Sequence, residues 1–145
     1  NTFRHHLIKN HPFLNWRLSS PGSQYQITFV HNEKNLVGMA ITRKKKMEEI
    51  TCLAIVDLLL LENHKRALNL IHHALHQLAI QNDCEAIAGL FSAYLARKYH
   101  LFRNGYLRTP RVFKVIIKPL SDKMPTEELC KEANWHLTWI DTDHV

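Results

Sequence analysis

The sequence predicts an α/β domain built on a mixed sheet, and three observations carry that prediction. The first half contains two alternating segments that read as a hairpin, followed by a segment that is apolar on both faces. The period then changes to that of an amphipathic helix. A further strand follows this helix through a tight connection, which favours a right-handed parallel crossover.

The strands of the first half differ in their patterns. Residues 24–31 alternate apolar and polar side chains, which is typical of a half-buried strand. Residues 36–43 form the second arm of the hairpin, after a turn at residues 31–35. Residues 50–61 are apolar throughout, which predicts a central strand that is covered on both sides.

The second half alternates helices with strands. Residues 64–82 form the first helix, with Asn63 as its N-cap, and residues 84–90 form a short strand. A second helix begins after Ser92 and ends at Asn104 and the glycine that follows.

The C-terminal third predicts three shorter elements. Residues 112–118 read as a strand that Pro119 ends, and residues 125–133 as a short helix with acidic residues in its first turn. Residues 134–140 alternate again and close the chain as a strand.

Composition narrows the class of function. The chain has 145 residues, 46% of them hydrophobic and 22% charged, which fits one soluble globular domain. Its net charge is +6, but the only basic cluster is RKKK at residues 43–46, which we expect in a solvated loop. No nucleic-acid-binding motif and no membrane-spanning run appears, so we expect neither partner. Three widely spaced cysteines suit a reducing cytoplasm.

Two long segments carry a resemblance to a known family. LLLLENHKRALNLIHHALHQLA (residues 58–79) ahead of CEAIAGLFSAYLARKYHLFRNGY (residues 84–106) resembles the GNAT superfamily of acyl-CoA-dependent N-acyltransferases. The most specific piece is the second helix running into Gly105-Tyr106, which looks like the family's helix ending in Gly-Phe. The resemblance covers about residues 24–140. It implies a mostly antiparallel central sheet flanked by helices, with one parallel strand-helix-strand crossover.

The flanking segments narrow the resemblance. FLNWRLSSPGSQY (residues 13–25), IVDL (residues 55–58) and WHLTWIDTD (residues 135–143) look like the second acyltransferase-like domain of bacterial two-domain GNAT proteins. Such domains occur in or near cell-surface polysaccharide pathways. We therefore expect residues 1–145 to be a single GNAT-like domain of a longer protein, with a second GNAT-like domain as its partner and an amine, such as an amino sugar, as acceptor.

The resemblance also implies a cofactor, acetyl-CoA or another acyl-CoA. In GNAT enzymes the central strand splays from its neighbour, the pantetheine lies in the gap, and the pyrophosphate rests on amides at the start of the next helix. The implied contacts come from the strand end, the turn, the helix start and one cap residue: Leu59, Leu60, Leu61, Asn63, His64, Lys65, Arg66, Ala67 and Ser92.

The turn departs from the family pattern Arg/Gln-x-x-Gly-x-Gly/Ala. Only Ala67 fits, since Lys65 replaces the first glycine and Glu62 is acidic where a cation or an amide is expected. One interpretation is that His64, Lys65 and Arg66 attract the phosphates in place of close amide contacts. The other is a solvated basic turn on a domain that binds no cofactor.

Acyl transfer to an amine needs a base for the amine and an acid for the departing thiolate. Many GNAT enzymes donate from a tyrosine four residues before the glycine, where this chain has Leu101. Tyr94 shares a helix face with Leu101 and is our candidate acid. Tyr99 is predicted to lie in the core with Leu95 and Phe102, at i, i+4 and i+7.

Asp57 is the single carboxylate in the apolar run at residues 54–61. It is either a base or a buried acceptor of hydrogen bonds.

His72 and His76 have a metal-binding i, i+4 spacing, but we expect both on the solvated helix face and predict no metal site.

Two classes of function follow from this sequence. The chain is either a GNAT-type acyltransferase or a catalytically degenerate GNAT fold that serves as a structural or ligand-binding module.

Overall fold

The computed structural model describes residues 5–6, 8–22, 24–61, 65–110, 115–118 and 126–142. Contacts divide the chain into two compact units. The sheet unit comprises residues 8–90 and 137–145, and the second unit comprises residues 1–7 and 91–136. That residues 1–145 form one domain stays a prediction.

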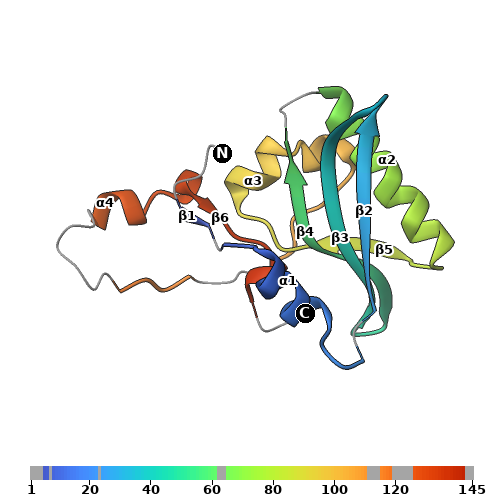
Figure 1. Cartoon of the computed structure of the whole chain (residues 1–145), viewed down its shortest axis with the longest axis horizontal. Coiled ribbons are helices and arrows are strands. Elements are labelled where there is room, and N and C mark those ends of the chain that lie inside the picture. The colour runs from blue at the N-terminus through green and yellow to red at the C-terminus, as the bar shows by residue number, and fades with distance from the viewer. Residues whose placement is uncertain are drawn as a thin grey trace. The chain divides into compact units, whose positions relative to one another are not determined.

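The sheet unit contains four strands in the order β2-β3-β4-β5 (Figure 1). The first three, β2 (Tyr25–Asn32), β3 (Asn35–Met47) and β4 (Ile50–Leu60), are antiparallel to one another. β5 (Ala86–Gly89) is parallel to β4, and α2 (Lys65–Gln81) connects the two. This confirms the predicted mixed, mostly antiparallel sheet with one parallel crossover.

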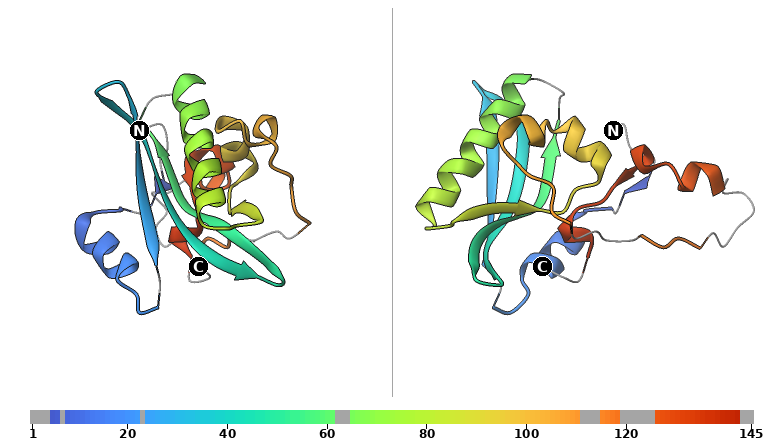
Figure 2. Two further views of the ribbon diagram at one scale, coloured as in Figure 1. Left: turned by 90° about the vertical axis from the view of Figure 1, so that its right-hand side faces the viewer. Right: turned by 180° about the vertical axis from the view of Figure 1, so that it is seen from behind.

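Helices lie on both faces of this sheet (Figure 2). On one face α2 buries a stripe of apolar side chains, comprising Ala67, Leu68, Ile71, Leu75, Leu78 and Ala79. On the other face a core cluster of Ile41, Val56 and Ile140 packs with side chains of α1 (His11–Leu18). The sheet is therefore covered on both sides, as the apolar sequence of β4 predicts.

The basic cluster at residues 43–46 is predicted to lie in a loop, and this prediction is wrong. The cluster belongs to β3, whose residues 43–46 pair with residues 51–54 of β4. The turn comes later, at Glu48 and Glu49, where Glu48 has a φ of 55°. The long arms follow from pairing with the apolar start of β4, which overrides the weak strand preference of lysine.

α1 is not among the predicted elements, although the sequence carries the signal for its start. The side chain of Asn10 accepts a hydrogen bond from the Phe13 backbone N–H at 3.1 Å, and Pro12 lies in the first turn. Both features are typical of a helix N-terminus.

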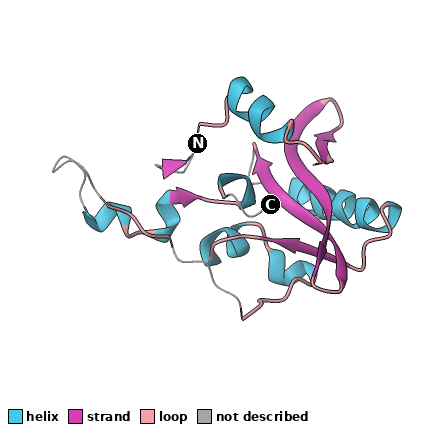
Figure 3. Ribbon diagram, turned by 90° about the horizontal axis from the view of Figure 1, so that it is seen from below, coloured by secondary structure: helices cyan, strands magenta, loops and turns pink. Residues whose placement is uncertain are grey.

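The second unit is built from short elements (Figure 3). These are β1 (His5–His6), α3 (Ala93–Lys98), the 3₁₀ helix η1 (Leu101–Asn104), α4 (Thr126–Leu129), the 3₁₀ helix η2 (Glu132–Asn134) and β6 (Trp135–His136). β1 and β6 pair in parallel. The predicted strand at residues 112–118 lies partly outside the described residues, and its described part, residues 115–118, is not in a strand.

The predicted closing strand at residues 134–140 is largely wrong. β6 ends at His136, and Thr138 then caps the 3₁₀ helix η3 (Trp139–Asp141). The Thr138 backbone N–H donates to the Asp141 carboxylate at 2.8 Å. Such local side-chain hydrogen bonds compete with strand pairing, which explains why alternation alone misleads here.

Among the residues that the structure describes, no helix has the length and apolar character needed to cross a membrane.

Candidate functional site

The C-terminal half of β4 leaves its parallel neighbour. Pairing with β5 ends at Ile55 opposite Gly89, whereas β4 continues to Leu60. Beyond Ile55, β3 is the only described strand that pairs with β4. The ribbons of β4 and β5 diverge from this point (Figure 1). This is the splay that the family resemblance implies for the pantetheine.

Three leucines predicted to contact the cofactor lie at this divergence. Leu59 and Leu60 are half-buried at the end of β4, and Leu61 is 66% exposed directly after it. Apolar side chains at an open strand end suit the methylene groups of an extended chain such as pantetheine, in which they alternate with amides. Their contact with a ligand stays a prediction.

The helix that follows gives the site its positive end. α2 begins at Lys65 and carries no acidic residue in its first turn. Arg66 is exposed, whereas Ala67 is buried against the sheet unit's core. The first-turn amides of a helix lack intrahelical acceptors, and the helix dipole favours an anion there. Asn63, His64 and the side chain of Lys65 lie outside the described residues, so their predicted contacts remain predictions.

Asp57 is almost fully buried, at 1% exposure, and it contacts segments far away in the sequence. Its Oδ1 lies 2.9 Å from Lys9 Nζ and accepts a hydrogen bond from Thr138 Oγ1, also at 2.9 Å. Lys9 Nζ also lies 3.6 Å from Asp141 Oδ2. The four side chains therefore form a buried cluster with two carboxylates and one ammonium group.

A register shift in β4 places this carboxylate. Ile41 pairs with Asp57 and Thr42 pairs with Ile55, so Val56 has no partner in β3. Such a bulge re-aims side chains locally. As a result Val56 packs with Ile41 and Ile140 while Asp57 reaches Lys9 and Thr138.

The cluster supports the interpretation of Asp57 as a structural acceptor. Its Oδ1 has an ammonium, a hydroxyl and the Leu58 amide as partners, whereas Oδ2 has no hydrogen-bond partner among the described residues. The role of Asp57 as a base therefore depends on Oδ2 and stays a prediction. Lys9 and Thr138 are not among the predicted site residues, because pairing across such a separation in sequence leaves no periodic signal.

Ser92 and Tyr94 belong to the second unit. Ser92 caps α3, since its Oγ accepts a hydrogen bond from the Leu95 backbone N–H at 3.1 Å. The backbone N–H of Tyr94 donates to the Glu132 carboxylate at 3.2 Å. The cofactor contact of Ser92 and the acid role of Tyr94 remain predictions.

The predicted second helix is interrupted. α3 ends at Lys98, His100 adopts a left-handed conformation with φ 51°, and a 3₁₀ helix follows. Tyr99 is 2% exposed, as predicted for a core aromatic, but Phe102 is 53% exposed. The prediction for Phe102 is wrong because the break at His100 changes the helical phase.

Two side chains that flank this break, Tyr99 and Leu101, are buried. Leu101, in the family's tyrosine position, is buried and offers no proton. The hydroxyl of Tyr99 lies 3.3 Å from His136 Nε2, and its ring meets Phe91 edge to face. Burial raises the pKa of Tyr106 to about 12, so this phenol stays protonated at neutral pH.

The histidine pair on α2 differs from the prediction. His76 is exposed, but His72 is buried at 7% exposure. Within the described part of the chain no group of three or more His, Cys, Asp or Glu residues is arranged to hold a metal ion.

Comparison with solved structures identifies the fold. The chain is similar to a candidate acetyl transferase from Pyrococcus furiosus, with a TM-score of 0.55 at 16% identity over 74% of each chain. An aminoglycoside acetyltransferase from an uncultured soil metagenomic sample, solved with trehalose, gives a TM-score of 0.51 at 16% identity over 79% of this chain and 77% of that one. A protein of Thermus thermophilus gives a TM-score of 0.51 at 15% identity, covering 66% of this chain and 72% of its own.

No protein-family model and no curated protein matches the sequence. The similarity to solved structures therefore shows the fold, and the chain has a GNAT-like fold.

Proposed function

We propose that this chain is an acyl-CoA-dependent N-acyltransferase domain that transfers an acyl group, acetyl in the simplest case, to an amine. The observation that carries the proposal is the divergence of β4 from β5 directly before the N-terminus of α2. It joins an open apolar strand end to a positive helix terminus. A molecule with an extended, partly apolar arm and a phosphate group, such as acyl-CoA, matches both parts.

The residues at this place fit the cofactor. Leu59 and Leu60 would lie beside the pantetheine, and the first-turn amides of α2 with Arg66 would hold the pyrophosphate. No acidic side chain of that first turn opposes an anion. When bound, acyl-CoA supplies an activated thioester, and the chain's own groups have to orient and deprotonate the amine.

Asp57 and Tyr94 are the candidates for the proton transfers. Asp57 Oδ1 is already occupied by Lys9 and Thr138, so a proton from the amine would go to Oδ2. Tyr94 would donate to the leaving thiolate.

For the acceptor we propose an amino sugar. The resemblance to the second domain of bacterial two-domain GNAT proteins supports this choice, since those domains are linked to surface polysaccharides. The aminoglycoside acetyltransferase of similar fold is also named for amine-bearing sugars. A second GNAT-like domain in the full protein and a cytoplasmic location belong to the same proposal.

Specific observations favour a second candidate function, a degenerate GNAT fold without turnover. Leu101 stands in the tyrosine position and is buried, and Asp57 is engaged in a buried ion pair. In that case the fold would bind a ligand, or only support its partner domain.

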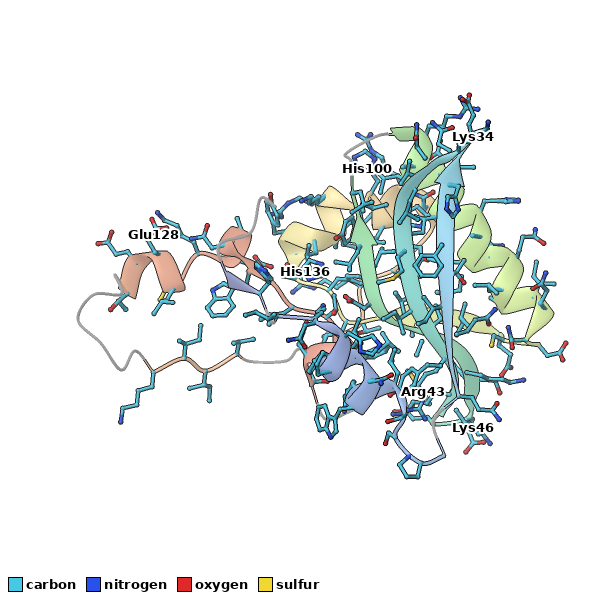
Figure 4. The ribbon with its side chains drawn as sticks, viewed as in Figure 1. Lys34, Arg43, Lys46, His100, Glu128 and His136 are labelled. Atoms are coloured by element: carbon cyan, nitrogen blue, oxygen red, sulfur yellow. The ribbon has the colours of Figure 1, made fainter. Side chains whose placement is uncertain are left out.

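Calorimetric titration with acetyl-CoA tests the cofactor site. We expect binding by the natural chain and at least about tenfold weaker binding by Lys65→Glu/Arg66→Glu, because like charges repel the pyrophosphate. The matched control is Lys44→Glu/Lys46→Glu, which changes the net charge equally. Both lysines lie near the C-terminal end of β3, and Figure 4 shows Lys46 at the opposite end of this strand from Lys34.

Three outcomes separate the candidates. No heat at millimolar acetyl-CoA would reject the cofactor site, and equal loss in both variants would reject its location. Binding without acylation of a panel of amines, amino sugars included, would favour the degenerate fold. Product should be followed by chromatography, because the exposed thiol of Cys130 would react with thiol reagents.

A further inference from the structure

β2 is a long strand at one margin of the sheet, and its pairing with β3 is regular from Tyr25 to Val30. Among the described strands it pairs only with β3. The opposite margin strand, β5, has only four residues, whereas β2 has eight. Natural sheets protect their edge strands by shortness, charged side chains, proline or a covering segment, because a free edge pairs with other chains.

The sequence of β2 contains none of these protective residues. YQITFVHN contains no Lys, Arg, Asp, Glu or Pro. Two of its apolar side chains are largely exposed, Ile27 at 44% and Phe29 at 55%. An uncharged edge with exposed apolar side chains is the composition expected of a strand that pairs with another strand.

The exposed pair continues the apolar face that α1 covers. Ile27 pairs with the buried Ile41, and Phe29 pairs with Met39, which packs against the core cluster. Tyr25, two residues before Ile27, also packs there. The apolar face of the sheet therefore extends past α1 to the sheet margin, where its last side chains, Ile27 and Phe29, are exposed to solvent.

We infer that β2 is a dimerisation edge, where a second copy of this chain adds its own β2 in antiparallel orientation about a two-fold axis at Thr28. In this register Ile27 of each copy lies opposite Phe29 of the other copy. Opposite residues of an antiparallel pair share a face, so both apolar pairs lie on one side of the joined sheet. A two-fold axis makes the contact self-complementary and closed.

Charge favours a second copy in this orientation. The basic residues 43–46 lie beside the Tyr25 end of β2, and the turn with Glu33 and Lys34 lies at the other end (Figure 4). Antiparallel pairing separates the two basic clusters. Each then lies on the side of a turn whose two charges offset one another, so the basic clusters of the two copies do not face each other.

Sedimentation equilibrium over a range of concentrations tests the inference. We expect a species of twice the chain mass of 17.0 kDa. Ile27→Lys/Phe29→Lys should weaken association about a hundredfold or more, because it places ammonium groups opposite one another. Ile50→Lys/Ile80→Lys is the matched control, since both isoleucines are exposed and lie outside β2. It should leave the dimer intact.

Disulfide trapping tests the register without those substitutions. In a Cys130→Ser background, Thr28→Cys should cross-link to itself when oxidised glutathione is added, because residues at the axis lie within disulfide distance. Gln26→Cys, on the same face, should not, since its two copies would be roughly 13 Å apart.

Several results would overturn the dimer. They are a monomer at all concentrations up to about 100 μM, equal dissociation of the control variant, or cross-linking through Gln26→Cys as fast as through Thr28→Cys. A complex of this edge only with another protein would overturn it as well.

Discussion

At the scale of single residues, the contact between Asp57 and Lys9 ties together segments that are remote in sequence. Lys9 precedes α1, Asp57 lies in the middle of β4, and Thr138 follows β6. Lys9 is 10% exposed and Asp57 is 1% exposed, so both charges have lost most of their water. A buried ion pair adds little net stability compared with apolar residues in the same positions. Removing one partner is costly, because the other charge then stays buried without a counter-charge.

Lys9→Met should therefore destabilise the chain by about 3 kcal/mol, because it leaves the Asp57 carboxylate buried without its counter-charge. Urea unfolding followed by circular dichroism measures this loss. The control is Lys46→Met, which removes an exposed ion pair to Glu49 and should cost less than about 1 kcal/mol. Replacing both buried partners, in Lys9→Met/Asp57→Leu, should recover part of the loss. Equal losses in the free energy of unfolding for Lys9→Met and Lys46→Met would contradict the buried pair.

At the scale of elements, local patterns predict what local physics determines. The hairpin, the central strand, α2 and the short parallel strand follow from periodicity, since each buries a side that its own sequence marks. The Ser92 cap and the glycine after η1 are also local features.

The elements that the sequence analysis misses depend on distant partners or on local competition. β3 extends through four basic residues because β4 pairs with them. The second helix breaks at His100, and the closing strand gives way to the Thr138 cap. In the site, the strand end and helix start could be predicted, but Lys9 and Thr138 could not, because no spacing links them to Asp57.

Gly38 shows how closely β3, β4 and α2 meet near the proposed site. A Cβ at this position would lie 2.9 Å from Leu60 Cδ2, 3.2 Å from the Leu59 carbonyl oxygen and 3.4 Å from Ile71 Cδ1. Gly38→Ala should destabilise the chain by about 1–3 kcal/mol through overpacking, measured by urea unfolding.

The double variant Gly38→Ala/Leu60→Ala separates the two kinds of contact. It relieves the side-chain clash but leaves the contact with the Leu59 carbonyl, so its loss should be smaller than the sum of the two single losses. Strict additivity would show that Gly38 and Leu60 do not meet.

At the scale of the whole molecule, the two compact units do not follow the order of the chain. The sheet unit takes residues 8–90 and then residues 137–145, after the second unit has taken residues 91–136. The last described residues therefore belong to a core whose other members precede residue 60. Contacts between such distant segments carry no periodic signal, and they make the C-terminal segment a part of the sheet unit's core.

Ile140→Ala should destabilise the sheet unit by about 3 kcal/mol, because Ile140 is 2% exposed and packs on Ile41 and Val56. Ile116→Ala is the matched control, since the same atoms are removed from a side chain that is 92% exposed, and it should change stability by less than about 0.5 kcal/mol. Urea unfolding of both variants makes the comparison. Equal stability of the two would show that residues 137–142 are not part of the core. A selective loss in Ile140→Ala would show that residues 137–142 belong to the core of the sheet unit, and a chain shortened to residue 136 would lack both this contact and the Thr138 partner of Asp57.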